Sequence, residues 1–401
     1  MRLAKQRNGT IRSAFAEVEA AKARRVSAYA AFLPSITPNF VYTYQDQEIA
    51  NPQFGGRRFI FDQKLGSIDA NWLFFDSGQR NTAYRRARVS EQAQFQTATN
   101  QLRQTLFTVE RQYFETLRAQ EQLKVSEAQR TRTQAVLEQT KKRVEVGDAA
   151  RREILQASAD ALNADVSLLT ARNLVATQGA SLKASIGLEV TNALPPLEPV
   201  AESPEFDRPS DLNQLWTKAI SARPDLMAAR EQEEAQRLNV LNFKTNAGVT
   251  YSLSGAYTLQ VTPDRLSNRS LRLLVSYPLF DGGAARADVR AAESTLESQR
   301  LQNLQLERNI RSEIESAYLQ HSQNIERLAA AKAAVAAARE NYAAALGAQQ
   351  VGSGDLIEVL TAQVSLVTAE NNYINALYDT LISDLSLKLA TGQPLPGENT
   401  A

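Results

Sequence analysis

The sequence predicts a mainly α-helical chain with four β-strands, built as a duplicated half-molecule. Phe75-Asp76-Ser77-Gly78 recurs as Phe280-Asp281-Gly282-Gly283, and Val146-Gly147 recurs as Val351-Gly352. Both pairs have an offset of 205 residues (281 minus 76), and no gap is needed between them. Solenoid repeats have periods of about 20 to 50 residues, so this period indicates two copies of one half-molecule.

Each half contains a long helix that turns back on itself. Residues 78–146 contain no proline and no internal glycine, and apolar residues recur there at three- and four-residue steps. At ~1.5 Å per residue, roughly 70 residues form a rod on the order of 100 Å long. Gly147 ends this helix, because glycine commonly follows a helix end. We expect Asp148 or a neighbour to cap the return helix, which runs to Gly187.

The expected domain organisation follows from these helices and from the positions of proline. It consists of a first repeat over residues 1–187 with its tip at 147, an irregular linker over 188–210, a second repeat over 211–392 with its tip at 352, and a tail over 393–401. Each repeat opens with a rising helix, expected over 8–31 and 211–243. These helices supply the roughly 30 residues by which each return helix is shorter than its long partner.

Four segments alternate apolar and polar residues and predict strands, at about 37–47, 64–75, 247–260 and 269–280. A loop is expected over 48–61. Strands of about ten residues with one apolar face are typical of outer-membrane barrels. A closed barrel needs about eight strands, and open strand edges cannot face lipid, so several chains would have to pool their strands. The alternative is two soluble hairpins on a coiled-coil bundle, as in a soluble scaffold or adaptor protein.

Composition excludes several functional classes. Lys and Arg number 45 against 44 Asp and Glu, so no net charge draws the chain to nucleic acid. The chain has no Cys and one His, which argues against a thiolate metal site or a cysteine nucleophile. No acid–base pair, catalytic triad or metal-ligand constellation stands out. We therefore expect neither a cofactor nor a metal, and no enzymatic activity.

Several short motifs carry a family resemblance when they are taken in order. They are Leu33-Pro34-Ser35, Arg223-Pro224-Asp225-Leu226, Leu279-Phe280-Asp281-Gly282-Gly283, and the two Val-Gly turns followed by Glu153-Ile154-Leu155-Gln156-Ala157 and Glu358-Val359-Leu360-Thr361-Ala362. With these motifs in this order and a repeat offset of 205 residues, the sequence resembles the TolC-like outer-membrane factor family over essentially the whole chain. The resemblance implies a homotrimer that shares a 12-stranded outer-membrane barrel and a periplasmic α-barrel. It also implies a passive exit duct for drug efflux or type I protein secretion, with a periplasmic adaptor and an inner-membrane transporter as partners.

The resemblance assigns the two helix-hairpin tips to adaptor contact. The candidate contact residues are Val146, Gly147, Asp148, Val351, Gly352, Ser353, Gly354 and Asp355. The alternative is that the two glycines only close the hairpins by accepting a positive φ.

Gate carboxylates are expected just beyond the tips. In the family they occupy the position of Glu358 and the position three residues later, which is Thr361 here. Glu153 is the counterpart of Glu358 in the first repeat. Three copies at a narrow mouth would form acidic rings that select cations. The alternative is local: Asp355 and Glu358 also have the spacing of a capping box.

Aromatic residues cluster where the strands give way to the long helices. They are Trp72, Phe74, Phe75, Tyr277 and Phe280. Barrels carry such aromatic girdles at the membrane interface, so we expect these residues to contact outer-membrane lipid. The alternative is a soluble aromatic core.

The first residues, Met1-Arg2-Leu3-Ala4-Lys5, lack the apolar core of a signal peptide. Together with the resemblance, this leads us to expect a removed leader and a chain that begins near its mature start. The expected location is the Gram-negative outer membrane, with an extension into the periplasm.

Overall fold

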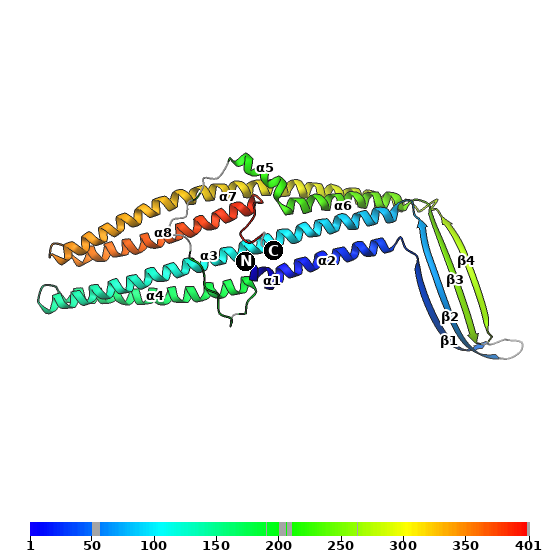
Figure 1. Ribbon diagram of the computed structural model, residues 1–401, viewed down its shortest axis with the longest axis horizontal. Helices are drawn as coiled ribbons and strands as arrows, with labels where there is room; N and C mark the ends of the chain where they lie inside the picture. Colours follow the sequence, from blue (N-terminus) through cyan, green and yellow to red (C-terminus); the bar gives the residue numbers. More distant parts are fainter. Residues whose placement is uncertain (50–56, 190, 200–205, 207–210, 263, 399–401) are drawn as a thin grey trace. The chain divides into compact units, whose positions relative to one another are not determined.

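The computed structural model describes residues 1–49, 57–189, 191–199, 206, 211–262 and 264–398. The described part is mainly helical and contains four strands (Figure 1). The helices are α1 (Arg2–Arg7), α2 (Gly9–Ala30), α3 (Gln79–Glu145), α4 (Arg151–Ile186), α5 (Leu212–Ala222), α6 (Pro224–Asn246), α7 (Ala284–Gln350) and α8 (Leu356–Ala390). The strands are β1 (Ser35–Ile49), β2 (Arg57–Phe75), β3 (Thr250–Thr262) and β4 (Leu266–Ser276). The predicted duplicated, mainly helical fold is therefore confirmed.

The chain forms two compact units. Unit 1 comprises Met1–Phe15, Thr97–Asp225 and Leu306–Ala401, and unit 2 comprises Ala16–Gln96 and Leu226–Gln305. Unit 1 contains the two helical hairpins, and unit 2 contains the sheet and the helix segments that lead into it.

None of the helices in the described part of the chain is both long and apolar enough to cross a membrane.

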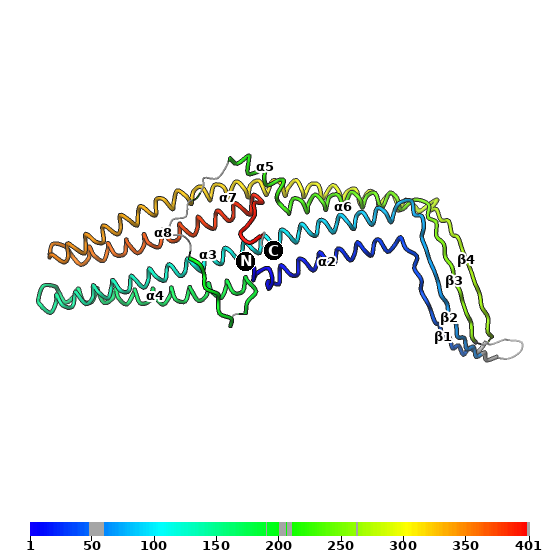
Figure 2. Tube along the Cα trace, in the orientation of Figure 1, coloured from blue at the N-terminus to red at the C-terminus, as the bar shows by residue number. Residues whose placement is uncertain are grey.

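In unit 1, apolar positions spaced by three and four residues bring α3 and the hairpin of α7 and α8 together (Figure 2). Leu117 on α3 packs with Ile374 and Tyr378 on α8. Nearer the tips, Val136 on α3 packs with a cluster on α8 that includes Val359, which is fully buried. The apolar residues at three- and four-residue spacing on the long helices therefore join the first repeat to the second.

The rising helix expected over 8–31 matches α2, whereas the rising helix expected over 211–243 is interrupted and consists of α5 and α6. Pro224 has no backbone N–H and restricts the residue before it, so Arg223 adopts an extended conformation between α5 and α6. In the first repeat α1 ends before Asn8, which is also extended. Asn8 Oδ1 accepts a hydrogen bond from the Thr10 N–H at 2.8 Å and so begins α2.

Each interruption packs on the end of a return helix. Gly187 ends α4 with φ 81°, and a Cβ there would lie 2.8 Å from the Arg7 carbonyl oxygen. Gly392 follows α8 with φ 73°, and a Cβ there would lie 2.9 Å from the Ala222 Cβ. Arg223 also donates to the Ala390 carbonyl at 2.9 Å. The repeats therefore share a joint at which only glycine fits.

The four strands form one antiparallel sheet in the order β1-β2-β3-β4. The central pairing of β2 with β3 places Trp72 opposite Leu253, and β3 places Leu253 opposite Leu273. Strands β1 and β2 extend to Ile49 and back to Arg57, which shortens the loop expected over 48–61. Residues 50–56 of that loop lie outside the described residues. Strand β4 ends at Ser276, four residues before its predicted end.

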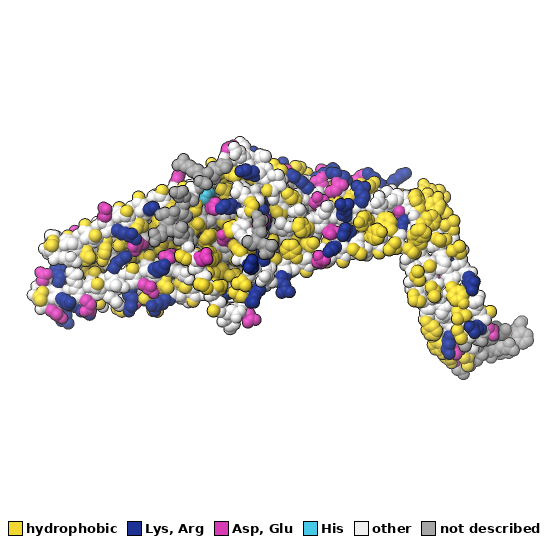
Figure 3. Space-filling model, viewed as in Figure 1, with side chains coloured by type: hydrophobic (Ala, Val, Ile, Leu, Met, Phe, Trp, Pro, Cys, Tyr) yellow, Lys and Arg dark blue, Asp and Glu magenta, His cyan; other side chains and the backbone are white. Residues whose placement is uncertain are grey.

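The register gives the sheet one apolar and one polar face. The apolar face carries aromatic and aliphatic residues from all four strands: Phe40, Tyr42, Ile68, Trp72, Leu253, Tyr257, Leu271 and Leu273. The opposite face is linked by polar side chains, since Asn39 and Ser67 both donate to Asp69 Oδ2 at 2.7 and 2.8 Å. Figure 3 shows hydrophobic side chains gathered over the strands.

Candidate adaptor-contact and gate site

The tip of the first hairpin is closed by a left-handed glycine. Gly147 has φ 81°, and the Asp148 N–H donates to the Arg143 carbonyl at 2.8 Å across the last turn of α3. Arg143 also forms an ion pair with Asp148 at 2.9 Å. Val146 is 80% exposed beside this turn, so an apolar side chain is presented at the end of the hairpin.

The tip of the second hairpin repeats this arrangement. Gly352 has φ 77°, and the Ser353 N–H donates to the Ala348 carbonyl at 2.9 Å. A Cβ on Gly354 would lie 3.0 Å from the Ala348 Cβ, so the turn requires a small residue there too. Val351 is 79% exposed. The glycines thus close the hairpins, and each tip leaves one valine in solvent.

Glu358 and Thr361 lie on one face of α8 and line the same surface groove. The groove has a volume of about 560 Å³ and is otherwise walled mainly by alanines of α7. Both side chains are exposed, whereas Val359 and Leu360 between them are buried against α3 and α7. The Thr361 hydroxyl donates to the Ile357 carbonyl at 2.7 Å, so it is held by its own helix.

Glu153 serves a local purpose that Glu358 does not share. Its Oε1 accepts a hydrogen bond from the Ala150 N–H at 3.2 Å, one half of a capping box at the start of α4. Asp148 or a neighbour was expected to cap this helix, and the N-cap residue is the neighbour Ala150. At α8, Asp355 occupies the N-cap position without a side-chain capping bond. The capping-box alternative for Asp355 and Glu358 therefore fails at Asp355.

Three of the five girdle residues cluster at the ends of β2 and β3. Trp72 contacts Phe74 at 5.8 Å between ring centroids, and Tyr251 contacts Phe74 at 6.0 Å and Phe75 at 5.4 Å. A register shift between Leu73 and Phe75 brings both phenylalanines beside Tyr251. Tyr251 is not among the predicted girdle residues, although it belongs to the same alternating pattern as Leu253.

In the second repeat, the connection from the last strand to the long helix leaves its aromatic side chains exposed. Tyr277 and Phe280 follow β4 instead of lying within it, and they are 56% and 90% exposed. In the first repeat Asp76 is buried and pairs with Arg80 at 2.9 Å, and Arg80 lies over the Phe32 ring. The two strand-to-helix connections have therefore diverged. The first contains the Asp76–Arg80 ion pair, and the second exposes its aromatic residues.

Two arginine–carboxylate triads that the sequence did not predict connect α8 to α3 and α7. Glu370 on α8 lies 3.3 Å from Arg132 on α3 and 3.5 Å from Arg339 on α7. Further from the tips, Asp379 lies 2.7 Å from Arg118 and 3.1 Å from Arg327. The α3 arginines are 238 and 261 residues from their carboxylates, and the Arg327–Asp379 pair spans 52 residues, so no local pattern could have paired them.

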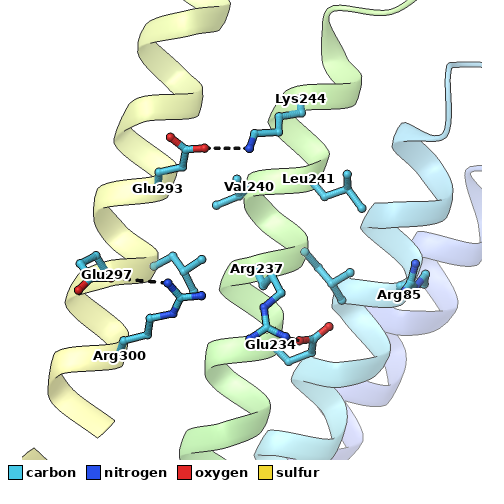
Figure 4. A pocket seen from close by; sticks show the side chains of 11 residues that line it. Arg85, Glu234, Arg237, Val240, Leu241, Lys244, Glu293, Glu297 and Arg300 are labelled. Carbon is cyan, nitrogen blue, oxygen red and sulfur yellow. Dashed lines mark hydrogen bonds and ion pairs between the residues drawn. The ribbon is translucent and has the colours of Figure 1, made fainter. Parts of the chain in front are cut away.

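A surface cavity of about 690 Å³ in unit 2 lies between α6, α7 and the first turns of α3 (Figure 4). Its acidic side chains are matched by bases: Glu293 pairs with Lys244 at 2.8 Å and Glu234 with Arg237 at 2.7 Å. Arg300 lies 3.6 Å from Glu297. The carboxylates of this cavity are therefore engaged in ion pairs with neighbouring basic side chains.

Comparison with known proteins identifies the chain. A family model described as outer membrane efflux protein matches residues 1–188 and 215–393. The chain belongs to this family. It is therefore an outer-membrane exit duct for efflux with a periplasmic extension, and the soluble-scaffold alternative is wrong.

Individual relatives agree with this assignment. The chain is 26% identical over 340 residues to the outer membrane efflux protein BepC of Brucella suis biovar 1, covering 81% of this chain and 71% of the relative. It is 24% identical over 401 residues to the outer membrane protein TolC of Salmonella enteritidis, covering 96% and 79%. The fold matches the outer membrane protein VceC of Vibrio cholerae with a TM-score of 0.81 at 18% identity, covering 98% of this chain and 95% of that one.

Proposed function

We propose that three copies of this chain form a passive duct by pooling their sheets into one 12-stranded barrel. The observation that carries this proposal is the sheet itself. It has one apolar and one polar face, and its outer strands β1 and β4 each pair on one side only within the described residues. Such edges cannot face lipid, and three four-stranded sheets in a ring leave none open.

In this arrangement the apolar face contacts lipid and the polar face lines the lumen. Trp72, Phe74, Phe75 and Tyr251, with Tyr277 and Phe280, form the girdle at the periplasmic interface. The exposed Phe280 at the β4 edge would be covered by a neighbouring copy or by lipid. The duct performs no reaction and needs no cofactor, because its function is to guide substrates that a pump delivers.

The hairpin tips are proposed to dock a periplasmic adaptor, which connects the duct to an inner-membrane transporter. Each tip presents one exposed valine on a rigid, glycine-closed turn, a small apolar anchor of the kind that protein interfaces bury. Val351→Asp should abolish binding of the purified adaptor while the protein still assembles in detergent. Unchanged adaptor binding by this variant would exclude the second tip from the interface.

Glu358 is proposed as the gate carboxylate, with Thr361 beside it. Glu358 is exposed on the face of α8 opposite the packed core and makes no capping bond, so its charge is available to a narrow mouth. Glu153 is a weaker candidate, because its carboxylate binds its own helix terminus.

Planar-bilayer recording tests the duct directly. The purified protein should insert and give discrete conductance steps of uniform size, as a closed barrel requires. The matched control is a variant with Leu253→Asp and Leu273→Asp, which places charges on the apolar face of paired strands and should prevent insertion. Equal insertion by this variant, or no channels from the wild type, would contradict the proposal.

A further inference from the structure

Unit 1 contains a cavity of about 470 Å³ that the duct does not explain. It lies between α3, α4 and the proline-containing segment after α4, and it is also lined by Met1, Leu3 and Pro396. Its walls are mainly apolar and include Val109, Leu182, Ile186 and Leu194. A volume of this size is within the range of sites that bind small organic molecules.

Two polar side chains of α3 enter this apolar cavity. Glu110 and Tyr113 are three residues apart, so they lie on one face of the helix. The Tyr113 hydroxyl donates to the Glu198 carbonyl at 2.6 Å and is thereby satisfied. Glu110 Oε2 is inaccessible to solvent and accepts no hydrogen bond from any residue that the structure describes. A buried carboxylate oxygen without a partner requires an explanation.

Two positive charges favour the ionised form of Glu110: the side chain of Lys388 on α8 and the amino group of Met1, which also lines the cavity. The Lys388 Nζ donates to Asp384 at 2.6 Å, and the negative charge of Asp384 opposes the effect of both. Burial is the largest influence and raises the pKa of Glu110 to about 7. The carboxyl group is thus poised to ionise when a positive charge enters the cavity.

We propose that this cavity binds a small hydrophobic organic cation, with Glu110 as its counter-ion and the aliphatic side chains around its apolar part. A positive charge placed beside Oε2 would supply the missing partner in a site where the surrounding protein screens it less than water does. The Tyr113 ring, on the same helix face, offers a second attractive surface for a cation.

The second repeat provides an internal contrast. The counterparts of Glu110 and Tyr113, 205 residues later, are Glu315 and Tyr318. Glu315 is exposed on α7 and does not line the cavities of about 690, 560 and 470 Å³ described above. The ligand site therefore belongs to one half of the duplication, and Glu315→Gln is a matched control for Glu110→Gln.

Binding of benzyltrimethylammonium to the assembled protein in lipid nanodiscs tests the site, with saturation-transfer NMR as readout and empty nanodiscs as background. The probe keeps its charge at every pH, so any pH dependence comes from the protein. With a pKa of about 7, the ionised fraction of Glu110 rises about tenfold between pH 6 and pH 8, so the affinity of the protein for the probe should rise about tenfold over the same interval. Glu110→Gln should weaken binding at pH 8 by at least about tenfold and remove the pH dependence. Glu315→Gln should bind as the wild type does.

Three results would overturn the proposal: no binding by the wild type, equal binding by Glu110→Gln, or an affinity that does not change with pH. Neutral benzyl alcohol should not distinguish the wild type from Glu110→Gln, and a difference would indicate a change in cavity shape. Bilayer conductance should be the same in Glu110→Gln and the wild type. Failure of the ligand site would therefore leave the duct proposal intact, and the reverse also holds.

Discussion

Replacement of Glu370 by glutamine tests how the mouth of the duct is held together. Glu370 is one of two α8 carboxylates that form ion pairs with both α3 and α7. Its side chain is only 10% exposed, and its two oxygens lie 3.3 and 3.4 Å from the two terminal nitrogens of Arg132. Arg339 approaches Oε1 at 3.5 Å from the other side. Glu370→Gln keeps the shape of the side chain and removes the charge between two arginines.

The magnitude follows from the exposure of the partners. Breaking a buried ion pair costs about 3–5 kcal/mol, because the remaining charge is left without a counter-ion. An exposed pair contributes about 0.2–1 kcal/mol. The Arg132 side chain is 25% exposed and lies between these limits, so Glu370→Gln should cost about 1–3 kcal/mol. Local separation of α8 from α3 would then be about 5- to 150-fold more frequent.

Hydrogen–deuterium exchange of residues 356–370, followed by mass spectrometry on the assembled protein, measures this opening. The control is Arg339→Gln: the Arg339 side chain is 67% exposed, so its ion pair should contribute only about 0.2–1 kcal/mol. Exchange that is unchanged in Glu370→Gln would refute the reasoning. An equal increase in exchange in both variants would show that side-chain exposure does not determine which of the two ion pairs contributes more to stability.

Three further perturbations test separate features. Glu358→Gln should raise single-channel conductance and lower cation selectivity, whereas Glu153→Gln should change neither, and identical recordings from both would remove the gate assignment. Gly352→Ala should destabilise the second tip by about 1–2 kcal/mol, because φ is 77° there, whereas Gly347→Ala within α7 should stabilise its helix by about 0.5–1 kcal/mol; local hydrogen exchange measures both. Glu110→Gln should raise the thermal midpoint at pH 8 but not at pH 4.5. The burial that raises the Glu110 pKa from 4.5 to about 7 makes the wild type lose stability as pH rises through this interval, and a midpoint shift that is the same at both pH values would contradict this origin.

The sequence predicted elements whose signals are local. Glycine at 147 and 352 marked the hairpin tips, and α3 and α7 end within two residues of these turns. Alternating residues predicted all four strands, because each strand has one apolar face. Strand β2 begins earlier than predicted, at Arg57, because two arginines followed by three consecutive apolar residues lack the alternation expected of a strand.

Long-range features could not be predicted in the same way. The pairing of β2 with β3 joins the two hairpins into one sheet, and the partners are nearly 200 residues apart. The contact between Arg132 and Glu370 spans 238 residues. The break at Arg223 was predictable in principle from Pro224 but was obscured by the apolar periodicity on both sides. Glu153 and Glu358 look equivalent in sequence, and only their hydrogen bonds distinguish the capping residue from the available carboxylate.

The central claim is that strands of several chains close one barrel, and the mass of the protein in detergent tests it most directly. Light scattering corrected for bound detergent should give a protein mass three times the 44.2 kDa of one chain, in particles that aggregate when detergent is removed. A monodisperse monomer or dimer that stays dispersed without detergent would contradict the account, since the apolar face of the sheet would then need neither lipid nor neighbouring chains.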